Sequence, residues 1–171
     1  MVVAQHAKGD KRVHHLQKIA NIRIEGLDGI RLKPEVEHER KVAIFDLLEE
    51  NYFAPIGDET GPYDVDLSIE DGKRLVLNVA KEDSTNHFVQ IKVPLMPVRK
   101  IVKDYFLVCD SYFKAIKTAS PAQIEAIDMG RRGLHNEGSV ILRERLEEKV
   151  HIDHDTARRL FTLVCVLHIR Q

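Results

Sequence analysis

The sequence predicts an α+β fold, an antiparallel β meander of about four strands packed against four to five helices, with the C-terminal helix buried. Three observations predict it. Between residues 63 and 93, apolar side chains alternate with polar ones, which is typical of half-buried strands. From residue 98 onward the apolar period changes to about 3.6, the period of a helix. The segment 160–167 is apolar on nearly every side, as a central helix must be.

The first third of the chain predicts one strand, one helix and a short edge segment. Ile22 and Ile24 alternate with polar residues and so indicate a half-buried strand. Residues 34–51 predict a helix, because the proline at position 34 fits a first turn, where its missing N–H costs nothing. Residues 52–56 form an extended piece, and the proline at position 55 restricts it to an edge or a lead-in.

The clearest strand pattern covers residues 63–70. Asp71 and Gly72 follow it and tolerate the backbone of a tight turn, so the chain should return as a hairpin through residues 75–79. A third strand is expected at 87–93. Together these segments predict the meander.

The second half of the chain predicts helices. Residues 98–116 place their apolar side chains, up to Phe113 and Ile116, on one broad arc that should cover the sheet. Ser120 begins a capping box followed by proline, which is a specific helix start. Three glycines then predict an interruption near His135 and a new helical run over 139–148. The final helix should be capped by Asp153 or Asp155.

Composition excludes several classes of protein. Apolar residues make up 43% of the 171 residues, and the formal net charge is −1. Such a chain has no net attraction for nucleic acid or anionic lipid. No segment approaches roughly 20 consecutive apolar residues and no signal peptide is recognisable, so we expect a cytoplasmic protein without a membrane segment. We expect a flexible N-terminal tail over residues 1–18 and a single domain over 19–171.

Several strings resemble a known family. They are HERKVAIFDLLEEN, IVKDYFL, IEAIDMGRRGLHNEG and DTARRLFTLVCVLH. Together they are similar to a family of alphaproteobacterial proteins catalogued only as an uncharacterised protein family, and the likeness runs from about residue 19 to the end. The resemblance implies a bacterial cytoplasmic protein, but it brings no activity, cofactor or catalytic residue.

The strongest candidate site is the segment 130–138, which contains Arg131, Arg132, His135, Asn136 and Glu137. Two guanidinium groups offer fixed forks for phosphate or carboxylate, and glycines let a ligand approach the backbone. His135 with Glu137 could move a proton. The alternative interpretation is a helix break whose arginines are solvated or paired with Glu137 and other acids.

A second candidate is Arg40, which lies on the apolar face of the helix predicted at 34–51. A guanidinium buried there without a partner would cost several kcal/mol. It therefore either extends to solvent near the helix start or is held by an acid from another element and lines a site. His38 falls on a different face of the same helix, so it does not form one cluster with Arg40.

Metal and thiol chemistry receive little support. His151, Asp153 and His154 have a superficial metal spacing, but aspartates are expected as caps there and no HExxH or cysteine partner is present. Cys109 and Cys165 stand among apolar residues and are expected to be small core side chains. We therefore predict no metal and no cofactor.

Two functional hypotheses remain. The first is a non-catalytic, cytoplasmic interaction or regulatory protein of bacteria, with a homodimer or another protein as the partner. The second is an enzyme or sensor that binds a small phosphorylated or carboxylated metabolite at Arg131, Arg132 and His135. Nucleic-acid binding is disfavoured, because Asp104 and Asp110 interrupt the basic helix face and no aromatic platform accompanies it.

Overall fold

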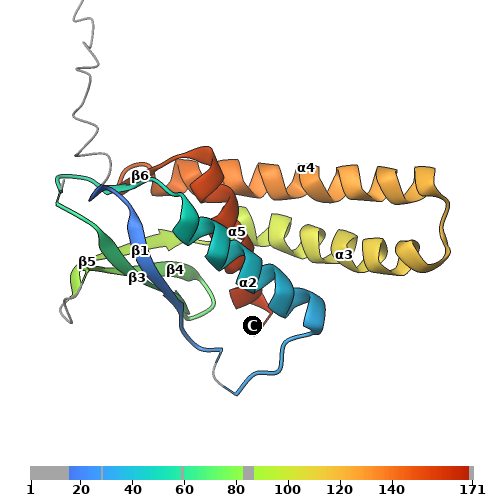
Figure 1. Ribbon diagram of the computed structural model, residues 1–171, viewed down its shortest axis with the longest axis horizontal. Helices are drawn as coiled ribbons and strands as arrows, with labels where there is room; N and C mark the ends of the chain where they lie inside the picture. The colour runs from blue at the N-terminus through green and yellow to red at the C-terminus, as the bar shows by residue number, and fades with distance from the viewer. Residues whose placement is uncertain (1–15, 28, 59, 83–86, 170–171) are drawn as a thin grey trace, which may run out of the picture.

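A computed structural model describes residues 16–27, 29–58, 60–82 and 87–169. The elements in chain order are β1 (Ile19–Ile24), α2 (Pro34–Glu49), β2 (Phe53–Pro55), β3 (Tyr63–Glu70), β4 (Arg74–Lys81), β5 (His87–Pro94), α3 (Met96–Thr118), α4 (Pro121–Leu146), β6 (Val150–Ile152) and α5 (His154–His168). The predicted α+β class is confirmed. Strands gather at one end of the molecule and helices extend from it (Figure 1).

The main sheet has the strand order β1-β3-β4-β5. β3, β4 and β5 pair antiparallel, which confirms the meander. β1 instead pairs parallel with β3, with Ile22 beside Val65, so the sheet is mixed rather than purely antiparallel. The physical reason is the connection between β1 and β3, which contains α2 and is long enough for the crossover that parallel neighbours require.

A second, two-stranded sheet joins β2 to β6. Ala54 pairs with His151 in an antiparallel register. The edge position expected for β2 is confirmed, whereas β6 was not predicted from the sequence. The chain leaves β6 directly into α5, so this small sheet fixes where the buried helix begins.

α5 is the central helix, as predicted. Leu160, Phe161 and Leu163 are at most 1% exposed, and burial continues to Leu167. α5 packs against both α2 and α4 (Figure 1). Its N-cap is Asp153, whose side chain accepts a hydrogen bond from the Thr156 backbone N–H at 2.8 Å. Both cysteines are buried, which confirms their expected place in the core.

α3 and α4 form an antiparallel hairpin whose far half projects beyond the rest of the molecule (Figure 1). Val98, Ile101 and Val102 at its base are buried as predicted. Phe113 and Ile116 are 37% and 50% exposed, so the expectation that the whole arc covers the sheet is wrong. The helix extends beyond the sheet, and its last turns pack against α4.

α4 begins at the predicted capping box, in which both reciprocal hydrogen bonds between Ser120 and Gln123 are present. The predicted interruption near His135 and the separate helix at 139–148 are wrong, because α4 is continuous from Pro121 to Leu146. A glycine inside a helix costs only about 1 kcal/mol, and packing against α3 and α5 exceeds this local preference.

The N-terminal end of the described chain is packed. Gln17 is 8% exposed, and its backbone carbonyl accepts a hydrogen bond from the Phe53 N–H at 2.9 Å. Of the tail predicted at residues 1–18, residues 1–15 lie outside the described part.

Among the described residues, no helix is both long enough and apolar enough to cross a membrane.

Candidate functional site

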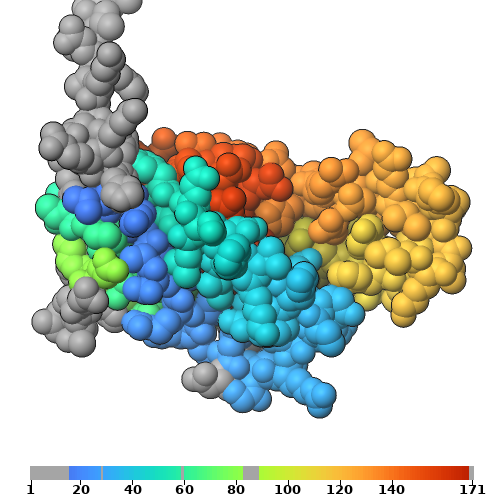
Figure 2. All heavy atoms as spheres, viewed as in Figure 1, coloured from blue at the N-terminus to red at the C-terminus, as the bar shows by residue number. Residues whose placement is uncertain are grey.

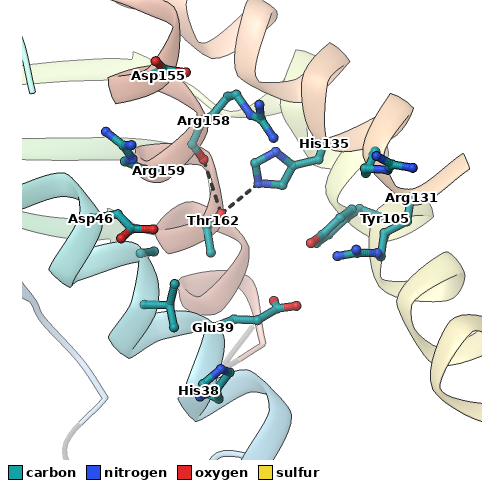
Figure 3. Close-up of a pocket in the computed structure, with 13 residues that line it drawn as sticks. His38, Glu39, Asp46, Tyr105, Arg131, His135, Asp155, Arg158, Arg159 and Thr162 are labelled. Carbon is teal, nitrogen blue, oxygen red and sulfur yellow. Dashed lines mark hydrogen bonds between the residues drawn. The ribbon is translucent and has the colours of Figure 1, made fainter. Parts of the chain in front are cut away.

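A cleft of about 480 Å³ opens where α2 faces α4, with α5 and α3 between them. Figure 2 shows the surface hollowed between α2 and the helical hairpin. Charged and polar side chains from all four helices line it (Figure 3). Three of the predicted site residues, Arg131, Arg132 and His135, are among them.

Four arginines meet in this cleft. α4 contributes Arg131 and Arg132, and α5 contributes Arg158 and Arg159. The two arginines of α4 share one acid, because Asp128 accepts from Arg131 at 2.6 Å and lies 3.1 Å from Arg132 Nε. These contacts lower the pKa of Asp128. The alternative interpretation of the arginine pair is thus correct in part, although the acid is Asp128 and not Glu137.

The two arginines of α5 differ in their bonding. Arg159 Nη1 donates to the Glu50 backbone carbonyl at 2.8 Å. The Arg158 guanidinium makes no hydrogen bond or ion pair to any described residue, and it extends toward the His135 ring (Figure 3). An unpaired guanidinium is a strong donor for phosphate or carboxylate. Arg158 is therefore the cation of the cleft with most bonding capacity left.

His135 is held by α5 in a defined orientation. Its Nε2 lies 2.8 Å from Thr162 Oγ1, and that hydroxyl donates to the Arg158 backbone carbonyl at 3.3 Å. The hydroxyl proton is thereby used, so Nε2 carries the proton of this bond and Nδ1 keeps a lone pair. Nδ1 is buried and has no hydrogen-bond partner within the described part.

Burial keeps His135 neutral. It lowers the pKa of His135 to about 4, and the nearby charges of Arg158 and Arg131 add to the effect. The ring packs against Phe161 at 5.1 Å and Tyr105 at 5.5 Å between centroids. A neutral imidazole adds no charge to the cleft, so the positive charge beside it is that of the arginines.

The acids of the cleft come mainly from α2. Glu39 is half-buried and faces the arginines, and Asp46 lies further along the same helix (Figure 3). Burial raises the pKa of Glu39, and the charge of Arg131 offsets this only partly.

The other predicted residues lie elsewhere. Asn136 Oδ1 bonds to His154 Nε2 at 2.9 Å, and Glu137 is exposed outside the cleft. In a continuous helix, residues two apart point in different directions, so His135 and Glu137 cannot act as a pair. Arg40 is paired with Glu37 of its own helix at 2.5 Å and does not line the cleft.

The α5 wall of the cleft was not among the predicted site residues, although the sequence contains a signal for it. Asp155, Arg158, Arg159 and Thr162 follow the spacing i, i+3, i+4 and i+7, which places them on one face of a helix. A polar stripe on a helix that is otherwise apolar marks the face that does not enter the core. That stripe is the α5 wall of the cleft.

Metal binding has no geometric basis within the described residues. They contain no group of three or more His, Cys, Asp or Glu side chains placed to hold an ion. His151, Asp153 and His154 of the superficial metal motif instead belong to β6, the α5 cap and the first turn of α5.

Comparison with known proteins gives a family without an assigned activity. Residues 16–170 match the model described as "Uncharacterised protein family (UPF0262)". A UPF0262 protein of Paramagnetospirillum magneticum is 61% identical over 156 residues, which cover 91% of this chain and 98% of the relative. One from Mesorhizobium japonicum is 56% identical over 154 residues, covering 90% and 94%. No solved structure matches.

Proposed function

Since the chain belongs to UPF0262, an uncharacterised protein family, as its matching strings predicted, we propose its function from the cleft alone: it binds a small phosphorylated or carboxylated metabolite there. This proposal places the protein in the cytoplasm, as a sensor or as an enzyme. The anion sits against the Arg158 guanidinium, in the part of the cleft that His135 also lines.

One observation carries the proposal. The Arg158 guanidinium, which is exposed and has no partner among the described residues, lies in the cleft beside the half-buried His135 ring. A guanidinium that is accessible in a concave site and has no acid bound to it among the described residues favours an external phosphate or carboxylate. Arg131 and Arg132 support the anion less, because Asp128 already neutralises part of their charge.

The test is calorimetric titration with inorganic phosphate and with acetate, accompanied by thermal unfolding. We expect binding and a rise in Tm, because a ligand that binds only the native state stabilises it. Arg158→Ala should lower the affinity by about tenfold or more, the value of a charge-assisted hydrogen bond. The double variant Arg131→Ala/Arg132→Ala should lose less.

Arg145→Ala is the matched control, because Arg145 is an exposed arginine of α4 outside the cleft. It removes the same charge from the protein and should leave the affinity unchanged. Equal losses in Arg145→Ala and Arg158→Ala would mean that only net charge matters, and the proposed site would be wrong. No binding of either anion by the unaltered protein would reject the function.

A second candidate is the interaction or regulatory role, and an exposed apolar stripe on α2 favours it. Val42, Phe45 and Leu48 are 43%, 66% and 40% exposed. Large apolar side chains grouped on one surface are typical of partner contacts. If the partner is a second copy of the chain, sedimentation velocity should show a dimer that Phe45→Asp dissociates. A monomer at every concentration would exclude this partner.

A further inference from the structure

A second hollow, here called the annex, continues the cleft along α2 toward the start of that helix. Its volume is about 410 Å³. His38, Glu39 and Arg131 line both the cleft and the annex, so the two share a wall. The remaining annex residues are Pro34, Glu35, Tyr112 and Phe113. The cleft and the annex are therefore adjacent hollows between α2 and the helical hairpin, and together they are called the groove.

The annex differs from the cleft in chemistry. Tyr112 and Phe113 present two rings in an edge-to-face arrangement, with centroids 5.8 Å apart. Arg131 lies over the Tyr112 ring at 5.0 Å while its charge is paired with Asp128. Arg131 thus adds a flat guanidinium surface whose positive charge is neutralised by Asp128. Apolar groups lose contact with water by entering such a space.

Length and charge restrict what can occupy the whole groove. Pro34 and Asp46, which line its two ends, are twelve residues apart on α2, or about 18 Å at the rise of a helix. Inorganic phosphate or a short acid would fill only the Arg158 end. A second anion in the annex would face Glu35 and Glu39, whereas Pro34, Tyr112 and Phe113 offer contacts to an uncharged, apolar group.

We infer that the natural ligand is an amphiphile, a phosphate or carboxylate with an alkyl or aryl tail, whose head lies at Arg158 and whose tail lies in the annex between Pro34 and Phe113. This inference rests on the proposed function, because it needs the head group to bind in the cleft. It adds the substrate class, which the cleft alone leaves open.

The test compares matched probes by calorimetry, methyl phosphate with octyl phosphate and acetate with octanoate, each below its micelle concentration. Each buried methylene should raise the affinity about fourfold, so the octyl probes should bind at least about tenfold more tightly than the short ones. Phe113→Ser should remove most of this difference and leave the affinity for methyl phosphate unchanged. Phe113 is 37% exposed, so this variant should fold.

Phe45→Ser is the control, because Phe45 is an exposed phenylalanine that lines neither the cleft nor the annex. It should keep the full preference for octyl probes, whereas Arg158→Ala should weaken every probe. Equal binding of short and octyl probes would overturn the amphiphile and leave the proposed function intact. An equal loss of preference in Phe45→Ser would overturn the annex as the tail site. Absence of binding by all four probes would reject both proposals.

Discussion

Gly133 and Gly138 lie five residues apart on α4, yet their surroundings differ completely. A β-carbon at Gly138 would lie 2.3 Å from Cζ of Phe161, whereas one at Gly133 would meet nothing within 4 Å. Five residues turn a helix by about 500°, so the two positions face directions about 140° apart. Gly138 is needed because α5 approaches closely, and Gly133 has no such reason. Neither glycine serves as a turn.

The same contrast separates the two halves of α4. The C-terminal half lies in the body, where Ser139, Leu142 and Leu146 are at most 1% exposed. The N-terminal half belongs to the projecting hairpin, where Met129 is 61% exposed. His135 lies near their junction and is part of the cleft. Because α4 is unbroken, it holds Arg131 and Arg132 in the cleft, opposite the arginines of α5.

The largest expected effect is at the tight contact. Gly138→Ala forces a methyl group into the Phe161 ring, which is fully buried and cannot move aside easily. Overpacking of this kind should lower the free energy of unfolding by about 3 kcal/mol. Urea denaturation measures it. An unchanged midpoint would show that α5 yields, and the contrast between the two glycines would then have no energetic basis.

The second largest effect on stability is expected at His135, near the junction of the two halves of α4, and it depends on pH. Burial lowers the pKa of His135 from its ordinary value of 6.5 to about 4 in the folded chain, so between these pH values the unfolded chain holds a proton that the native state lacks. The free energy of unfolding should therefore fall as pH drops from 6.5 to 4. After a discount for partial solvent screening, His135 should account for about 2 kcal/mol of this fall in the free energy of unfolding.

His135→Gln should remove that part of the pH dependence, as measured by urea denaturation at several pH values. His151→Gln, at an exposed position of β6, is the control and should retain it. If both variants follow the unaltered protein across this window, His135 is not held neutral by its burial.

The start of α4 should give a smaller loss. Ser120→Ala removes one side of the capping box and should cost about 1 kcal/mol. Because Ser120 lies at the tip of the hairpin, hydrogen exchange should accelerate in the first turn of α4 and stay slow near Leu142. Uniform acceleration along the helix would mean that its two halves are not independent.

The smallest effect should have the opposite sign. Gly133→Ala replaces a flexible helical residue at an exposed position and should stabilise the protein by roughly 0.5–1 kcal/mol. Thermal unfolding should show a higher Tm. A lower Tm would indicate that the surface of α4 around Gly133 is in contact with another molecule or chain segment in solution.

Local patterns of the sequence determined most of the elements. Alternation over residues 63–79 defines β3 and β4, the capping box at Ser120 defines the start of α4, and the apolar run to Leu167 defines the buried helix. These signals succeed because they depend on residues a few positions apart, whose geometry the backbone fixes. The glycines near His135 misled the prediction because their local preference was weaker than the packing of α4.

Only the tertiary structure decided the direction of β1 and the composition of the cleft. Glu39, Arg131 and Arg158 are far apart in the chain, and they meet because α5 packs between α2 and α4. The sequence pointed to the arginines of α4, but it could not show that Asp128 pairs with them, nor that Arg158 has no partner among the described residues. Which charges are paired depends on distances between elements, and packing sets these distances.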